Sequence, residues 1–259
     1  MRYSRANKVL LEDKCPVVVY TMAKVASTSI YHSLKNQTDY PAFHVHSLNE
    51  SVIKASEKQA MDSGILPSSR QVGGLIYAHK IKQNKPLIII SSVREPIARN
   101  ISAFFDAFSY HVGMEADKWN GEAEELMQSY FLDKLDHNYP LNWFDNEFKR
   151  MTLVDVYESP FDSNKKYIVL NKDNLKILIF RVDLSDADKE ELIKKELDLD
   201  TFSLMSLNIG SEKKYANLYT NFKKDVKLPQ SYVDSMLNSK YARHFYSDQE
   251  LQNISSKYI

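Results

Sequence analysis

Short apolar runs rich in β-branched residues alternate with longer segments in which apolar residues recur every three or four positions. The run Pro16–Tyr20 (PVVVY) is typical of a strand buried on both faces, and Ser27–Asn36, with Ile30 and Leu34 on one face, is typical of a helix. The same patterns predict further strands at Phe43–His46, Gly74–Ala78 and Pro86–Val93, and further helices at Asn49–Ser63 and Pro96–Tyr110. This alternation favours an α/β fold with three layers and a central, mainly parallel sheet.

The second half of the chain predicts a strand pair followed by helices. Lys166–Leu170 and Leu175–Val182 are apolar runs separated by the turn Asn171–Asn174. Ser185 stands before a helical pattern, so it is a candidate for the residue that caps the helix. The helices expected in this half and just before it are Trp119–Leu135, Trp143–Arg150, Asp186–Leu197 and two helices after Pro229.

The composition is that of a globular protein, with 43% hydrophobic and 26% charged residues. Only 6 Gly and 8 Pro are present, and no stretch has the composition of a flexible linker. We therefore expect one domain over residues 1–259. The first 13 residues are polar and no run of about 18 apolar residues occurs, so no membrane span is expected and a cytoplasmic location is predicted.

Charge and cysteine content exclude some classes of function. The 34 basic and 34 acidic residues balance, whereas a protein that holds nucleic acid non-specifically carries a basic excess, so no nucleic-acid partner is expected. The single cysteine, Cys15, rules out an intrachain disulfide and a cysteine-based zinc site. His44 and His46 face the same way on a predicted strand, but the sequence offers no third ligand beside them, so no metal site is predicted.

The first candidate site is the segment Lys24-Val25-Ala26-Ser27-Thr28-Ser29, which follows a buried strand and opens a helix. The free N–H groups at a helix N-terminus attract an anion, to which the three hydroxyls and the lysine would add donors and charge. A simple helix cap would use one hydroxyl and does not account for the lysine. The segment also lacks the glycines and the Gly-Lys-Ser/Thr ending of a nucleoside triphosphate loop.

The second candidate site begins at Arg94, at the carboxyl end of an apolar strand, where ligands of open α/β sheets bind. Ser102 follows two turns along the next helix. A guanidinium grips a phosphate with two hydrogen bonds, and a hydroxyl can complete its shell. Arg99, between them, is equally compatible with a surface salt bridge. No aspartate ends this strand, so the site is predicted to handle its anion without a metal.

These two segments resemble the nucleotide motifs of sulfotransferases that use 3′-phosphoadenosine-5′-phosphosulfate (PAPS). The resemblance covers Pro16–Phe105 and is closest to the carbohydrate branch, especially heparan sulfate 2-O-sulfotransferase. The segment Ile76-Tyr77-Ala78-His79 resembles the part of that family that ends in a catalytic histidine. Asn142-Trp143-Phe144-Asp145 and Asp155-Val156-Tyr157 are similar to bacterial capsular polysaccharide synthesis proteins.

The resemblance implies a P-loop-like sulfotransferase fold and a role for each matching residue. Lys24 would steady the leaving phosphate, and His79 would take the proton of the acceptor hydroxyl. The 5′-phosphate would be held by the loop residues Ala26, Ser27, Thr28 and Ser29, and the 3′-phosphate by Arg94 and Ser102. A late basic loop with Lys213, Lys214 and Tyr215 would close over the nucleotide, unless it is only a solvated charged loop.

The expected reaction is a metal-free, in-line sulfuryl transfer from PAPS to a hydroxyl, with a carbohydrate as the favoured acceptor. A glycolipid or a small natural product as acceptor, a small-molecule kinase and a non-catalytic nucleotide-binding module are the alternatives. If His79 is not the base, the carboxylate of Glu115 is the next candidate.

Overall fold

The computed structural model describes residues 3–12, 14–62, 72–206 and 215–259. The chain forms two compact units, which are described separately. The first unit comprises Met1–Val93 and Trp143–Met205, and the second comprises Arg94–Asn142 and Ser206–Ile259. Lys213 and Lys214, which were predicted to close over the nucleotide, lie outside the described residues.

The first unit is built on a five-stranded sheet in the order β2-β1-β3-β5-β4. Its strands are β1 Val17–Tyr20, β2 Ala42–Val45, β3 Leu87–Val93, β4 Tyr167–Lys172 and β5 Leu175–Arg181. Only β4, at one edge, runs antiparallel, since it is joined to β5 by a tight hairpin. Every residue of β1 and β3 is buried, as the unbroken apolar runs predicted.

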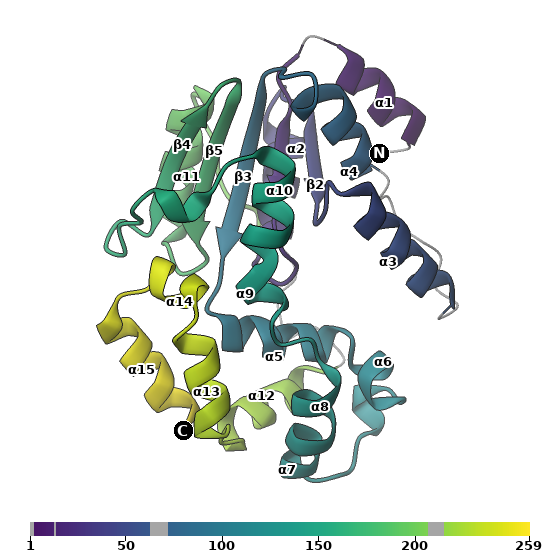
Figure 1. Ribbon diagram of the computed structural model, residues 1–259, viewed down its shortest axis with the longest axis vertical. Coiled ribbons are helices and arrows are strands. Elements are labelled where there is room, and N and C mark those ends of the chain that lie inside the picture. The colour runs from purple at the N-terminus through teal and green to yellow at the C-terminus, as the bar shows by residue number, and fades with distance from the viewer. Residues whose placement is uncertain (1–2, 13, 63–71, 207–214) are drawn as a thin grey trace. The chain divides into compact units, whose positions relative to one another are not determined.

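Helices cover both faces of this sheet (Figure 1). On one face, Ile30 and Leu34 of α2 (Ser27–Gln37) and Leu192 and Ile193 of α11 (Asp186–Leu197) pack in one core cluster with Val19 and other alternate strand residues. On the other face, Trp143, the last residue of α9 (Tyr139–Trp143), and Phe148 of the π-helix η5 (Phe144–Lys149) pack on Tyr20 of β1. The helix α10 (Arg150–Thr152) follows η5, and the other residues of α9 belong to the second unit. The prediction of an α/β fold with a mainly parallel central sheet is confirmed.

Several helices match their predicted bounds. Ser185 caps α11 by accepting from the Asp188 N–H, as expected. The remaining described helices of the first unit are α1 Tyr3–Leu11, α3 Glu50–Asp62, α4 Val72–Ile76, the π-helix η2 Tyr77–Ile81 and the 3₁₀ turn η6 Val156–Glu158. The N-terminal helix α1 was not predicted, because its few apolar residues give a weak pattern.

The predicted strand at Gly74–Ala78 is wrong, since this segment lies in α4 and η2. Val72, Ile76 and Lys80 are buried at a spacing of four, which is the period of a helix and not that of a strand. Gly73 allows α4 to approach the chain closely: a Cβ on it would lie 2.0 Å from the carbonyl oxygen of Ser47. The short apolar run was ambiguous between the two structures.

In its described part the second unit consists of helices. They are α5 Pro96–Asp106, α6 Phe108–Val112, η3 Ala116–Lys118, α7 Ala123–Leu126, η4 Met127–Phe131, α8 Leu132–Lys134, α12 Ala216–Asp225, α13 Gln230–Leu237, α14 Lys240–Phe245 and α15 Asp248–Tyr258. The helix expected from Trp119 starts only at Ala123, and three helices, not two, follow Pro229. The core is aromatic, with ring contacts that join Phe104, Phe105, Phe131 and Phe222.

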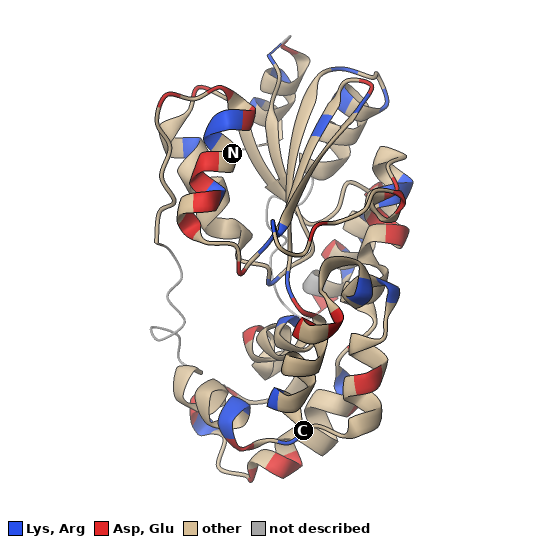
Figure 2. Cartoon of the chain, turned by 90° about the vertical axis from the view of Figure 1, so that its left-hand side faces the viewer, with Lys and Arg blue, Asp and Glu red and all other residues tan. Residues whose placement is uncertain are grey.

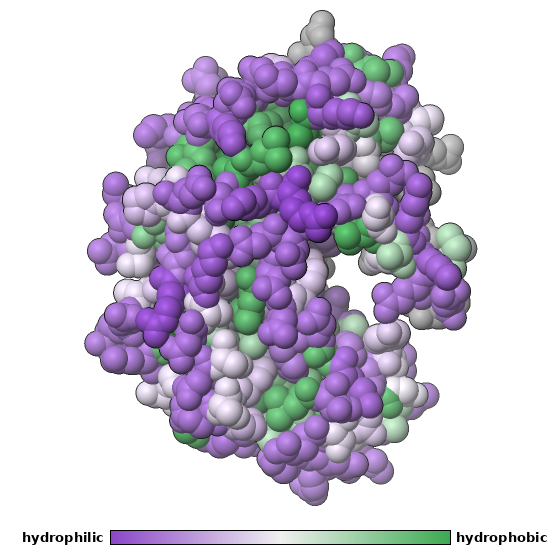
Figure 3. Space-filling model, viewed as in Figure 1, coloured by the Kyte–Doolittle hydropathy of each residue, from purple (hydrophilic) through white to green (hydrophobic). Residues whose placement is uncertain are grey.

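Hydrophilic residues dominate the face seen in Figure 3, and hydrophobic ones form smaller groups among them. Leu153, just after α10, is the most exposed large apolar residue of the described chain, at 74%. None of the described helices has the length and hydropathy needed to cross a bilayer.

The Tyr241 hydroxyl fixes the start of the second unit. It donates to the Arg94 carbonyl at 2.8 Å and accepts from the Arg94 N–H at 3.1 Å, and Tyr241 is fully buried. We expect Tyr241→Phe to lower the free energy of unfolding by about 1–3 kcal/mol, because two backbone groups lose their partner. Urea denaturation measures this, with Tyr110→Phe at an exposed ring as the control. Equal losses in both variants would contradict the assignment.

Candidate functional site

The loop between β1 and α2 has an unusual backbone. Lys24 and Ala26 both have positive φ, at 72° and 56°, although neither is a glycine. Such residues cost about 1–3 kcal/mol each and persist where the surroundings hold them, often at functional sites. Here Val25, fully buried between them, accepts a hydrogen bond of 2.7 Å from Ser92 Oγ of β3. The loop is therefore fastened to the neighbouring parallel strand.

Helix α2 begins without a side-chain cap. Its N-cap residue is Ala26, which has no polar side chain, so the hydroxyls of Ser27, Thr28 and Ser29 lie in the first turn and do not cap it. The interpretation of this segment as a simple hydroxyl cap is therefore wrong. A first turn whose N–H groups are not met by a side chain can accept an anion, which the helix dipole also favours.

Two histidines lie beside this loop at the carboxyl end of β2, because Tyr20 pairs with Val45 in the parallel ladder. His44 Nε2 lies 2.9 Å from Ser27 Oγ, and its ring stacks on Tyr31. Burial, aided by the charges of His46 and His32, lowers the pKa of His44 from its ordinary value of 6.5 to about 4. His44 is thus neutral at pH 7.

His46 is exposed, and its ring is oriented by the backbone. Nδ1 lies 2.8 Å from the carbonyl oxygen of Thr21, the first residue after β1. A carbonyl only accepts, so the neutral ring carries its hydrogen on Nδ1 and its lone pair on Nε2. This is the tautomer of an imidazole that can take a proton at Nε2. The sequence signal was the His-Val-His spacing, which predicted the shared face but not its place beside the Lys24 loop.

His79 lies elsewhere in the first unit. Its Nε2 is 2.9 Å from Asn7 Oδ1 of α1, and the adjacent Lys80 Nζ donates to the carbonyls of Glu12 and Lys14, which precede β1. These contacts belong to the amino end of the strands, and in Figure 1 the arrow of β3 points away from α1 and α4. His79 was expected to follow a strand and reach the carboxyl edge. The structure does not bring it to the Lys24 loop.

Arg94 and Ser102 belong to the second unit. Arg94 directly follows the last residue of β3, and Ser102 lies half-buried in the second turn of α5. The first turn of α5 is closed by Glu95, whose carboxylate accepts from the N–H groups of Ile97 and Ala98. Tyr258 donates to the same carboxylate, and burial raises the pKa of Glu95. An anion held here would therefore depend on side chains such as Arg94, because the helix terminus is already capped.

Arg99 is buried, so the alternative in which it forms a surface salt bridge is wrong. Its guanidinium lies over the Tyr139 ring, 4.6 Å from the centroid, and donates to Asn100 Oδ1.

Of the late loop predicted to close over the nucleotide, Tyr215 is described. Its hydroxyl lies 3.4 Å from Asp106 Oδ1, and its ring contacts Phe105. Glu115 is exposed at the start of η3.

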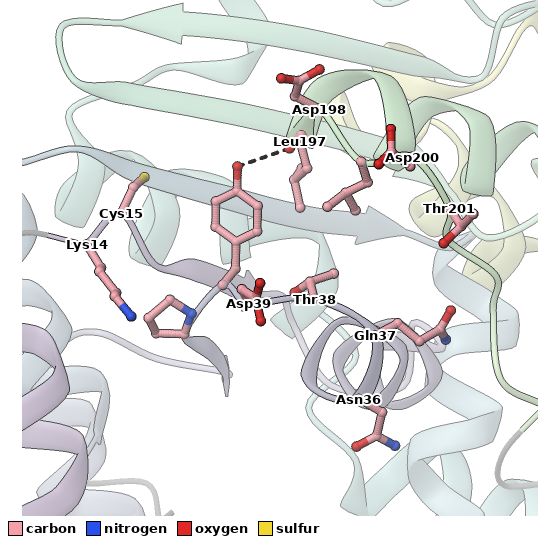
Figure 4. A pocket seen from close by; sticks show the side chains of 13 residues that line it. Lys14, Cys15, Asn36, Gln37, Thr38, Asp39, Leu197, Asp198, Asp200 and Thr201 are labelled. Atoms are coloured by element: carbon pink, nitrogen blue, oxygen red, sulfur yellow. Dashed lines mark hydrogen bonds between the residues drawn. The ribbon is translucent and has the colours of Figure 1, made fainter.

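A cavity of about 740 Å³ lies at the amino ends of β1 and β2, whereas the Lys24 loop follows the carboxyl end of β1 (Figure 4). It is lined by the residues before β1, those after α2 and those after α11, including Asp39, Asp198 and Asp200. Tyr40 also lines it, and its hydroxyl donates to the Leu197 carbonyl at 3.0 Å. Within the described ranges, no group of three or more His, Cys, Asp or Glu side chains is arranged to hold a metal ion.

Acidic and basic residues are interspersed along the helices in the view of Figure 2, in keeping with the balanced charge of the sequence. In the first unit, Lys24 and the α2 N-terminus are the local features that could hold an anion. Together the fold and this loop define an α/β protein whose parallel strands end beside an uncapped helix N-terminus, an arrangement that can accept an anion.

Residues 119–247, just under half of the chain, match the family NKWYS, described as "Putative capsular polysaccharide synthesis protein". The chain is similar to that family over this range, which contains Trp143 and Glu147 but not the Lys24 loop, His46 or Arg94. No curated protein and no solved structure was found to match the chain.

The lowered pKa of His44 predicts a pH-dependent stability. Between pH 6.5 and 4, His44 takes up a proton in the unfolded chain but stays neutral in the folded protein. The free energy of unfolding therefore decreases as the pH falls through this window. At pH 5 the loss attributable to His44 is about 2 kcal/mol. We expect His44→Gln to reduce, by about that amount, the difference in unfolding free energy between pH 7 and pH 5. Urea denaturation at both pH values measures it, and an unchanged difference would contradict the buried, neutral state.

Proposed function

We propose that the chain is a sulfotransferase of P-loop-like fold that moves a sulfuryl group from PAPS to a carbohydrate hydroxyl in capsular polysaccharide synthesis. The observation that carries the proposal is the loop at the end of β1. Its two left-handed residues lead into an uncapped helix, with Lys24 in the loop and His46 at the end of the adjacent strand. The capsular acceptor rests on the description of the family that matches residues 119–247.

The loop fits the 5′-phosphosulfate end of PAPS. The α2 N–H groups and the hydroxyls of Ser27 to Ser29 would bind the 5′-phosphate, although Ser27 Oγ also contacts His44. Lys24 would stabilise the negative charge that grows on the departing phosphate. Arg94 and Ser102 remain the candidates for the 3′-phosphate. PAPS supplies the sulfuryl group, and the residues of this chain orient it and handle the charge and the proton.

We assign the general base to His46, in place of His79. An acceptor hydroxyl is a poor nucleophile until its proton is removed, and a neutral imidazole suits that task near pH 7. His46 is exposed, lies at the same sheet edge as the Lys24 loop and has Nδ1 engaged by Thr21, so that Nε2 can accept the proton. His44, with its low pKa and its contact to Ser27, is suited to holding the loop and not to accepting a proton.

Lys24→Ala should lower the rate of sulfuryl transfer by about 10²–10³-fold, because the charge on the leaving phosphate loses its cation. The affinity for 3′-phosphoadenosine-5′-phosphate should fall much less, since the N–H groups of α2 remain. Transfer is followed by mass spectrometry of the product and binding by calorimetry. Lys35→Ala, at the exposed far end of α2, is the matched control and should behave as the wild type. Equal effects of the two substitutions would count against the loop as the reacting site.

His46→Gln and His79→Gln separate the two candidate bases. We expect His46→Gln to lower kcat by about 10²-fold or more, because an amide can hydrogen-bond but cannot take up the proton. His79→Gln should leave kcat near the wild-type value, since His79 contacts α1 at the other end of the strands. The reverse outcome, with loss only in the His79 variant, would return the role to His79.

A further inference from the structure

Glu147 is a buried carboxylate on the helical run in front of the sheet. It is only 6% exposed and lies in the π-helix η5. One oxygen, Oε1, accepts from the Tyr20 hydroxyl at 2.7 Å and from the Leu48 N–H at 2.7 Å. The same oxygen accepts from Ser47 Oγ at 3.0 Å and from the Asn49 N–H at 3.3 Å. Among the described residues, all its hydrogen-bond partners are neutral donors.

These donors belong to two segments that meet beside His46. Tyr20 is the last residue of β1, directly before Thr21, whose carbonyl engages the His46 ring. Ser47, Leu48 and Asn49 are the three residues that follow His46. Glu147 therefore holds the chain on both sides of the Thr21–His46 hydrogen bond.

Trp143 adds a third attachment from the same helical run. Its Nε1–H donates to the carbonyl of His46 itself at 3.3 Å. Tyr20, fully buried, packs its ring on Trp143 and on Phe148, with centroids 5.1 and 5.4 Å away. The backbone of His46 is thus fixed by Trp143, its ring by Thr21, and the following turn by Glu147.

A buried carboxylate is costly unless it is fully hydrogen-bonded, and apolar packing alone would join a helix to a sheet at lower cost. Four donors on one oxygen define the path of the His46 turn more narrowly than packing does, because hydrogen bonds are directional. A catalytic group misplaced by about 1 Å can cost about 10²-fold in rate. A turn that must hold a reacting side chain in place would account for the unfavourable free energy of burying this charge.

We propose that Glu147 is a positioning residue that sets the orientation of His46 at the carboxyl edge of the sheet. Its importance for turnover rests on the proposed function, whereas its effect on the His46 ring does not. Glu147 lies within the range that matches the capsular polysaccharide family, while His46 lies outside it. Through Glu147, the matched segment would thus act on His46, which belongs to the part of the chain that precedes the matched range.

The first test compares Glu147→Gln with Glu158→Gln, a matched control at an exposed carboxylate of the same unit. Glutamine keeps the size of the side chain but replaces the carboxylate charge, so the four donors lose their strong acceptor. We expect kcat to fall about tenfold or more in Glu147→Gln, with the KM for PAPS within about twofold of wild type. Tyr20→Phe removes one donor without altering Glu147 and should give a smaller loss of kcat.

The second test reads the His46 ring directly. In ¹⁵N-histidine-labelled protein, the two ring nitrogens report which one carries the hydrogen, and His46→Ala identifies the His46 signals. We expect Glu147→Gln to shift the His46 signals, and Glu158→Gln to leave them unchanged. His137, whose ring is fixed within the second unit by Tyr232 and the Phe131 carbonyl, serves as the internal reference in every variant.

The outcomes of the two tests distinguish a failure of the positioning role from a failure of the proposed sulfotransferase activity. Shifted His46 signals together with an inactive wild-type protein would leave the positioning role standing and overturn the sulfotransferase. An active wild type with unchanged His46 signals and unchanged kcat in Glu147→Gln would overturn the positioning role. A Glu147→Gln protein that shifts the His137 signals as well has lost its fold, and Tyr20→Phe then decides by the same two readouts.

Discussion

The path of the chain out of β1 is the constraint on which the rest of the site depends. Between the buried end of β1 and the start of α2, the backbone passes through Lys24 and Ala26 in left-handed conformations. Neither residue adopts this conformation cheaply, and the hydrogen bond from Ser92 to Val25 holds the loop against its cost. The result is an open helix N-terminus with a lysine beside it. The proposed chemistry needs both features in one place.

The histidine pair depends on the same parallel ladder. Because β1 and β2 end in register, Thr21 and His46 leave the sheet side by side and can hydrogen-bond. The buried carboxylate of Glu147 then joins the end of β1 to the turn after His46 from a helical run more than 90 residues later in the sequence. Residues 143–205 of the segment that matches a capsular polysaccharide family therefore belong to the same unit as the segment that resembles a nucleotide loop.

The elements that depend on a local pattern of residues were predicted correctly from the sequence. The apolar runs of β1 and β3, the hairpin of β4 and β5 and the helix α11 with its Ser185 cap were all found as expected. The segment around Gly74 was misassigned because a short apolar run with two glycines fits either period, and the burial of Val72, Ile76 and Lys80 at helical spacing is visible only in the folded chain. Because of that error, His79 was predicted at the carboxyl ends of the strands, whereas it contacts α1 at their amino ends. The contacts of Glu147 join residues about a hundred positions apart, so no local pattern could have predicted them.

The proposed function is tested most directly by measuring sulfuryl transfer itself. The protein is incubated with PAPS and a panel of capsular polysaccharides and their precursors, with EDTA present, and sulfated product is followed by mass spectrometry. We predict a sulfated carbohydrate together with 3′-phosphoadenosine-5′-phosphate, and a rate that EDTA does not change. Transfer of phosphate from ATP in the presence of Mg²⁺, with no product from PAPS, would contradict it.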